Sequence, residues 1–160
     1  MKASCKKYWY PTAILLLFLL AVFLRVYRLG ELPDVLHIDE AGLGYNAWCL
    51  AHYGTDRYLN VRPFYPQNFY GGQSPLYTYA LTLFIKTIGQ GNLSLWILKL
   101  PAVLASLLLF FVGIKSIDLL FNEKKWNVAA AFLLAVCPYY IMSARFALDC
   151  NLMLCCDGRG

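Results

Sequence analysis

The stretch YWYPTAILLLFLLAVFL, residues 8–24, is the first long apolar run of the chain and decides its fold class. It carries no charge, and with its aromatic flank it is long enough to cross roughly 30 Å of hydrocarbon. The whole chain has 160 residues, of which 60% are hydrophobic and only 14% are charged. This balance is far from that of a soluble domain. The sequence therefore predicts an all-α integral membrane protein.

Charged residues flank this first run on both sides. Lys2, Lys6 and Lys7 precede it, and Arg25 and Arg28 follow it. A cationic head before an apolar run is also typical of a signal peptide, but no small-x-small cleavage pattern follows. We therefore expect an uncleaved signal anchor that spans the membrane over about residues 8–28. The three lysines favour a cytoplasmic N-terminus, because cytoplasmic flanks are rich in positive charge.

Two further spans are predicted at residues 98–121 and 127–144, separated by a short polar segment that contains Lys124 and Lys125. The apolar part of segment 75–88 has only about two thirds of the length that a straight span needs. If this segment crossed the membrane, the two lysines would lie outside. If it lies along the interface, they lie inside, as the positive-inside rule favours. We therefore expect three spans.

The region between the first and second spans has a different composition. Prolines, glycines, tyrosines and most of the acidic residues collect there, which predicts an extracytoplasmic loop over residues 30–97. Apolar spacing within it predicts juxtamembrane helices at about 40–53 and 75–88. We assign residues 1–154 to one membrane domain and expect 155–160 to be a truncated or frameshifted end.

Composition also argues against several kinds of site. The six cysteines show neither a CxxC pair nor a histidine at metal-ligand spacing, so neither a zinc site nor a disulfide framework is predicted. The net charge of +5 is not gathered into a basic stripe. Nucleic acid is therefore not an expected partner.

The acidic pair in HIDE, residues 37–40, is the first candidate site. Asp39 and Glu40, beside His37, can act as a base, as metal ligands or as binders of a polar substrate. The alternative is a solvated loop whose carboxylates cap a short helix, since negative charge is favoured near a helix N-terminus.

Two other stretches offer candidate binding residues. Arg145 and Asp149 flank an apolar turn at the outer end of the third span, although residues at this spacing also form local ion pairs. The stretch YPQNFYGGQSPLY, residues 65–77, contains Tyr70 and Gln73. It suits a loop that presents stacking faces and backbone donors to a sugar or phosphate. An aromatic belt at the membrane interface is the alternative.

Four motifs then occur in order: HIDEAGLGYNAWCLAHYGTD at 37–56, GGQSPLYTYALTLFIKTIG at 71–89, LKLPAVLASLLL at 98–109 and SARFALDCN at 143–151. This set resembles the N-terminal region of the polyprenyl-phosphate-dependent glycosyltransferases of the GT-C superfamily, a group that includes protein O-mannosyltransferases and bacterial lipid A aminoarabinose transferases. The likeness extends to about residue 154. Each motif alone is a weak signal, and the ordered set is the specific one.

The resemblance implies a reaction and roles for several residues. A sugar would be transferred from a polyprenyl phosphate with inversion, Asp39 would be the general base with Glu40 beside it, and Asp149 would help to shape the donor phosphate or metal region. Arg145 would offset charge on the leaving phosphate. Several relatives carry a charged residue before the proline of the PLY segment, where this chain has Gln73 and Ser74. This departure argues against a metal or phosphate contact there, and Gln73 stays a candidate substrate-binding residue. No cofactor is predicted, and a divalent cation is left open because metal dependence varies in the superfamily.

The expected partners are a polyprenyl-phosphate-linked sugar donor, the membrane, and a lipid, polymer or protein acceptor that the sequence does not identify. The expected location is the bacterial plasma membrane, with several spans. Because the donor cavity of the resembling enzymes needs further helices, we expect this stretch to be inactive alone. The alternative function is that of a non-catalytic membrane protein, such as a transporter fragment or an assembly subunit.

Overall fold

A computed structural model describes residues 2–33, 35–68 and 71–147, with side chains from residue 8 onward. Within these ranges the chain is mostly helical. Its helices are α1 (Lys2–Val26), α2 (Ile38–His52), α3 (Pro75–Thr87), α4 (Leu95–Phe121), α5 (Lys124–Val136) and α6 (Pro138–Arg145). Two short strands, β1 (Gln67–Asn68) and β2 (Gly71–Gly72), pair antiparallel in the loop between α2 and α3.

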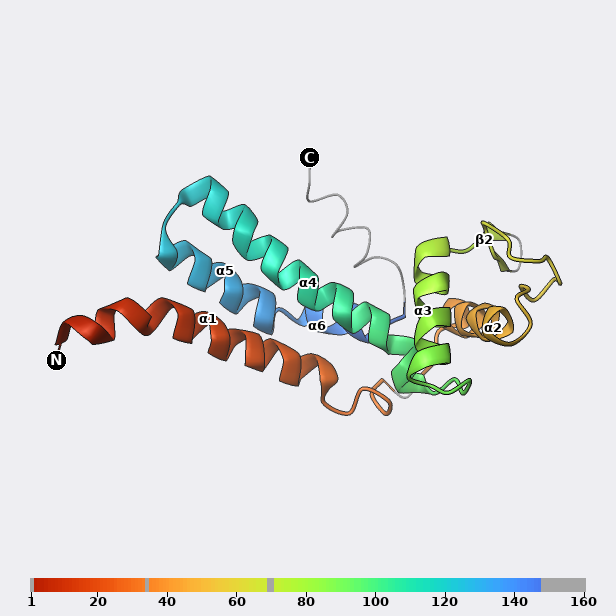
Figure 1. Cartoon of the computed structure of the whole chain (residues 1–160). Coiled ribbons are helices and arrows are strands. Elements are labelled where there is room, and N and C mark those ends of the chain that lie inside the picture. Colours follow the sequence, from red (N-terminus) through yellow and green to blue (C-terminus); the bar gives the residue numbers. More distant parts are fainter. Residues whose placement is uncertain (1, 34, 69–70, 148–160) are drawn as a thin grey trace.

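Helices α1, α4 and α5 lie side by side in an elongated bundle, in which α4 runs antiparallel to its two neighbours (Figure 1). The bundle core is formed by small, aromatic and aliphatic side chains, including Ala21, Phe110 and Ile114. A Cβ atom added at Gly113 of α4 would lie 2.5 Å from a methyl carbon of Leu134 in α5. The glycine therefore lets these two helices approach closely.

The outward faces of the bundle are apolar. Leu15, Leu16 and Phe23 of α1, Leu108 of α4 and Leu133 of α5 are all more than half exposed. A large apolar surface of this kind indicates contact with lipid or with other protein. Helices α1 and α4 are each long and apolar enough to cross a membrane, and α5 with α6 can form a third span bent by 50°. The described chain thus agrees with an all-α membrane protein.

The bend between α5 and α6 lies within the predicted third span and follows from Pro138. Proline has no N–H, so it cannot donate to the carbonyl four residues earlier, and the helix breaks. The guanidinium of Arg25, which is almost fully buried, compensates for this loss. It donates to the carbonyl oxygens of Leu134 at 2.8 Å and Ala135 at 3.4 Å, and its Nε donates to Ser106 Oγ at 2.8 Å.

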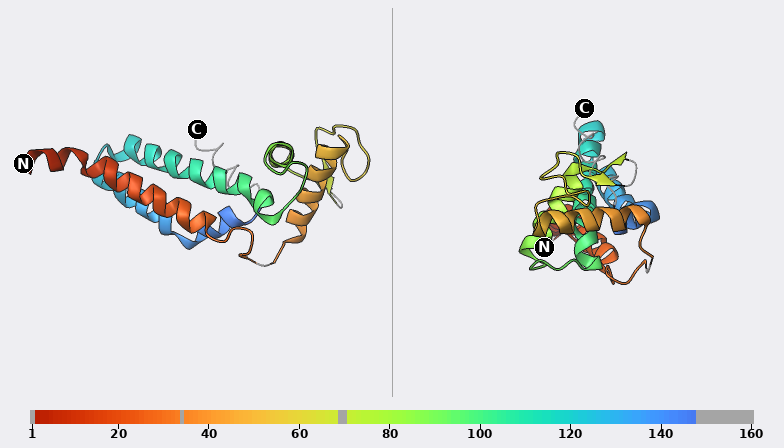
Figure 2. Two further views of the ribbon diagram at one scale, coloured as in Figure 1. Left: turned by 60° about the horizontal axis from the view of Figure 1, so that its bottom comes forward. Right: turned by 90° about the vertical axis from the view of Figure 1, so that its right-hand side faces the viewer.

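Helices α2 and α3 form a second unit at the end of the bundle where α1 ends and α4 begins (Figure 2). We call it the outer unit because it lies beyond this end of the bundle. They share a core that includes Leu43, Ala47 and Leu81 and that continues into the first turns of α4. Helix α3 lies across the end of α4 (Figure 1), and the Tyr77 hydroxyl donates to the carbonyl of Leu98 at 2.9 Å. This outer unit carries the predicted HIDE and YPQNFYGGQSPLY sites.

Candidate functional site

The two members of the acidic pair have different environments. Consecutive residues of an α-helix point about 100° apart, and Asp39 and Glu40 stand in the first turn of α2. Glu40 is fully buried, whereas the side chain of Asp39 is 55% exposed. The adjacent carboxylates therefore face different surroundings, which reduces their mutual repulsion.

The Glu40 carboxylate joins two distant parts of the chain. One oxygen accepts a hydrogen bond from the backbone N–H of His37 at 3.0 Å and completes a capping box at the start of α2. The other oxygen accepts from the backbone N–H of Ala147, which follows α6. The HIDE and SARFALDCN motifs are thus in direct contact through Glu40.

The Asp39 carboxylate has one close neighbour among the described residues. The backbone N–H of Asp39 donates to His37 Nδ1 at 3.2 Å, and the same ring nitrogen lies 3.4 Å from Asp39 Oδ2. A single nitrogen cannot accept the amide proton and donate to the carboxylate at once. While His37 caps the helix, its Nδ1 therefore does not donate to Asp39, and the exposed carboxylate can accept a proton from a bound hydroxyl.

A buried amide, Asn46, connects the Asp39 end of α2 to the following loop. Its Nδ2 donates to the Gln67 carbonyl at 2.9 Å and to Gln73 Oε1 at 3.0 Å, and its Oδ1 accepts from the Arg57 N–H at 3.1 Å. Gln73 in turn donates from Nε2 to the carbonyl of Asp39 at 3.2 Å. Gln73 is therefore held between Asn46 and the backbone of the proposed base.

The sequence interpretation did not single out Asn46. A signal existed, because Asn46 follows Asp39 by seven residues and two turns of helix bring such positions to the same face. Spacing alone does not reveal that the amide is buried and bonded to two loop segments.

The buried carboxylate of Asp56 organises the loop after α2. It accepts hydrogen bonds from the backbone N–H groups of Tyr58 and Asn60 and from the side chain of Asn60, each at 2.9 Å. A longer bond of 3.4 Å comes from the N–H of Gln67. Burial raises the pKa of Asp56, but these hydrogen bonds outweigh it and hold the pKa below its usual value.

Arg57 places a cation beside α2. Its guanidinium carbon lies 5.4 Å from the centre of the Tyr45 ring, within the range of a cation–π contact. Its Nη2 donates to the carbonyl of Gly42 at 3.4 Å. The sequence interpretation did not identify Arg57 as a site residue, since nothing in its local pattern links it to Tyr45.

Arg145 caps the C-terminal end of α1 through hydrogen bonds to its last carbonyl groups. Its Nη2 donates to the carbonyl oxygens of Leu24 and Tyr27, both at 2.8 Å, and its Nη1 donates to that of Leu32 at 3.4 Å. A cation is favoured at a helix C-terminus by the dipole and by the carbonyls that lack partners there. The guanidinium is thus engaged by the backbone, although its buried Nε has no partner among the described residues.

Two predicted site residues, Tyr70 and Asp149, lie outside the described residues. Ala147, which contacts Glu40, is two positions before Asp149 in the chain. In the described part of the chain, no group of three or more histidine, cysteine, aspartate or glutamate side chains could hold a metal ion.

Comparisons of the chain with protein-family models, with curated proteins and with solved structures found no match. The chemistry of the site must therefore be inferred from its own residues. Those residues provide an exposed carboxylate on a helix start, held by a buried carboxylate and by an amide network.

Proposed function

We propose that this chain supplies the general base of a membrane glycosyltransferase that uses a polyprenyl-phosphate sugar as donor. The observation that carries the proposal is the division of the acidic pair. Asp39 is exposed and open to substrate, while Glu40 is buried and fixes the helix start on which Asp39 stands. A general base needs an accessible carboxylate in a fixed position.

The arrangement of the helices supports an outer location for this site. Arg145 connects the end of α6 to the end of α1, and Glu40 connects the start of α2 to Ala147. The C-terminal ends of α1 and α6 and the N-terminal end of α4 thus lie at one end of the bundle (Figure 1). We propose that α1, α4 and the α5–α6 pair cross the bacterial plasma membrane, with the N-terminus in the cytoplasm.

In this topology α2 and α3 are juxtamembrane helices of the first extracytoplasmic loop. Labelling of single cysteines tests it. A cysteine at Lys124 is expected to react only after the membrane is permeabilised, whereas one at Gly71 is expected to react from outside. Reaction of both from the same side would contradict the three-span arrangement.

The proposed reaction is a displacement at the sugar C1 atom. The acceptor hydroxyl attacks C1 and passes its proton to Asp39, while the bond between C1 and the phosphate oxygen breaks and its electrons leave with the polyprenyl phosphate. Gln73, which donates to the Asp39 carbonyl, would orient the base, and His37 lies beside it. Contacts of Asp149 and Arg145 to the donor remain predictions of the resemblance, and a contact of Tyr70 remains a prediction from the composition of its loop.

The substitution Asp39→Asn tests the assignment. It keeps the shape of the side chain and removes the base. In a full-length protein that adds the helices of the donor cavity to this stretch, sugar transfer from undecaprenyl-phosphate donors in membrane vesicles is expected to fall about 100-fold or more. The matched control is Glu31→Gln, which removes an exposed carboxylate that pairs with Arg28. Transfer by the Asp39→Asn protein at the rate of the control would exclude Asp39 as the base.

A second candidate function is that of a non-catalytic assembly subunit. It is favoured by the loop tip beyond α2, where Leu59, Val61 and Phe64 are each more than three quarters exposed. Exposed apolar residues of this kind suit contact with another protein. This alternative predicts that Asp39→Asn has no effect, whereas Phe64→Ser disrupts a stable complex.

A further inference from the structure

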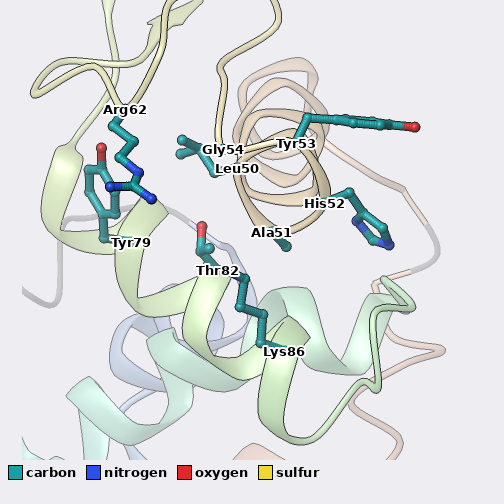
Figure 3. Close-up of a pocket in the computed structure, with 9 residues that line it drawn as sticks. All are labelled: Leu50, Ala51, His52, Tyr53, Gly54, Arg62, Tyr79, Thr82 and Lys86. Atoms are coloured by element: carbon teal, nitrogen blue, oxygen red, sulfur yellow. The ribbon is translucent and has the colours of Figure 1, made fainter.

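A cleft opens between the C-terminal end of α2 and helix α3 (Figure 3). Its volume is about 390 Å³. The polar side chains on its walls include the cationic residues Arg62 and Lys86, together with His52, Tyr79 and Thr82. None of the residues that line it is acidic.

The two cations are not neutralised within the described part of the chain. The ion pairs found there join Arg28 to Glu31 and His37 to Asp39, and neither involves Arg62 or Lys86. Both side chains are exposed toward the same concave space. Like charges that share a cleft repel, and an anion between them would convert that repulsion into attraction.

The backbone places Arg62 at this position at some cost. Its φ is 43°, in the left-handed region that residues other than glycine rarely adopt. The conformation is fixed because the N–H of Arg62 donates to the Gly54 carbonyl at 2.9 Å. The Tyr79 hydroxyl also donates to the Pro63 carbonyl at 2.6 Å. The loop thus returns to the end of α2 and carries the guanidinium into the cleft.

The hydroxyl groups of Thr82 and Tyr79 have little left to donate, and that of Tyr53 points away from Arg62 and Lys86 (Figure 3). Thr82 donates to the carbonyl of Thr78 at 2.8 Å, and Tyr79 donates to that of Pro63. A ligand therefore meets the N–H groups of Arg62 and Lys86 as the main donors. The guanidinium fork matches two oxygens of a phosphate, and the ammonium group adds a second point charge.

The geometry points to a phosphate-binding site in this cleft, held by Arg62 and Lys86. The phosphate belongs either to a lipid head group or to a soluble phosphate ester. The cleft lies at the opposite end of α2 from Asp39, about 20 Å away at 1.5 Å per residue. It is therefore too distant to hold the phosphate that reacts at Asp39, and it does not depend on the proposed sugar transfer.

The test measures binding by the purified full chain at low ionic strength. In one arm, inorganic phosphate and glycerol 3-phosphate are titrated calorimetrically into the protein in neutral detergent. In the other arm, native mass spectrometry counts the lipids retained from nanodiscs of phosphatidylglycerol or phosphatidylcholine. Binding in the first arm identifies a soluble ester, and selective retention of phosphatidylglycerol identifies a lipid head group.

Three variants make the result specific. Arg62→Gln with Lys86→Gln is expected to abolish the binding seen in either arm. Lys115→Gln with Lys125→Gln, which removes the same charge from the far end of the bundle, is expected to leave it unchanged. Arg62→Gly removes the cation but suits the left-handed backbone, so it is expected to weaken binding at least tenfold without lowering the melting temperature.

Three results would contradict the proposed phosphate site. Equal binding by the wild type and the Arg62→Gln, Lys86→Gln protein in both arms would exclude it, as would no binding by the wild type in either arm. An equal loss in the Lys115→Gln, Lys125→Gln control would show a general effect of charge. Because the readout is binding, failure here leaves the assignment of Asp39 untouched.

Discussion

Two buried cations of the bundle and two buried short side chains of the outer unit pair with backbone groups in different ways. In the bundle, single long cations reach carbonyls that helix breaks and helix ends leave without partners, as Arg25 does at the α5–α6 break and Arg145 at the end of α1. In the outer unit, short side chains such as Asn46 and Asp56 bind several loop amides each. A lipid environment offers no water to an unpaired carbonyl, whereas an outer loop can exchange some of its bonds with solvent.

This difference predicts that loss of a bundle cation is the most costly change. Arg25→Leu removes the partners of the Leu134 and Ala135 carbonyls and of Ser106 Oγ. Each buried group left unpaired costs about 1–3 kcal/mol, so we expect a loss of about 4 kcal/mol in the free energy of unfolding in detergent. Arg28→Leu, at an exposed ion pair with Glu31, is the control and should cost less than about 1 kcal/mol. Equal losses would show that Arg25 does not stabilise the break.

The next largest effect concerns Glu40, which connects the two regions. Glu40→Ala leaves the buried N–H group of Ala147 and the partly buried N–H group of His37 without their acceptor. We expect about 3 kcal/mol of destabilisation by chemical unfolding, from two unpaired donors. Asp39→Ala, one residue earlier, should change stability by less than about 1 kcal/mol, because its carboxylate is exposed. Similar losses would contradict the conclusion that Glu40 stabilises the fold whereas Asp39 is exposed and free of that role.

A smaller and pH-dependent effect is expected at Asp56 in the outer unit. Asp56→Asn removes the charge that accepts bonds from Tyr58 and Asn60, and it should cost about 2 kcal/mol at pH 7. The folded-state pKa lies below the ordinary 3.8. The stabilisation is therefore complete above the unfolded-state pKa and is lost as the pH falls through the folded-state pKa.

Melting curves of the wild type and the Asp56→Asn protein at decreasing pH check this sign. The difference between them should be constant from pH 7 to about pH 5 and should shrink below about pH 4. A difference that grew on acidification would mean that burial, rather than the hydrogen bonds, dominates at Asp56.

The limits of sequence-based prediction differ between the two regions as well. Apolar runs predicted α1 and α4, and helical spacing predicted α2 and α3, because these signals are local. Helix α2 begins at Ile38 instead of residue 40, since His37 acts as its cap. The third span was predicted as one segment, residues 127–144, and the break at Pro138 into α5 and α6 was not predicted. The compensation of this break by Arg25 was not predicted either. That contact joins residues more than 100 positions apart and depends on how the helices pack.

The same reasoning explains what was missed at the candidate site. The sequence presents Asp39 and Glu40 as equivalent neighbours. Glu40 differs from Asp39 in its capping bond to His37 and in its partner Ala147, 107 residues away, which no local pattern reveals. Asn46 and Arg57 carry no local signal that separates a buried network from an exposed helix face. Long-range partners therefore decide which polar residues stabilise the fold and which remain available to a substrate.

The smallest expected effect compares close packing in the two regions. Gly113→Ala places a methyl group 2.5 Å from a Leu134 methyl carbon, so α4 and α5 must shift or Leu134 must change rotamer, at about 1–2 kcal/mol. Gly71→Ala, in the outer hairpin, meets no atom within 4 Å and should be nearly neutral. Thermal unfolding of both proteins in one detergent checks this contrast. If Gly113→Ala were also neutral, Leu134 could yield without strain, and the tolerance of the α4–α5 contact would resemble that of the outer loop.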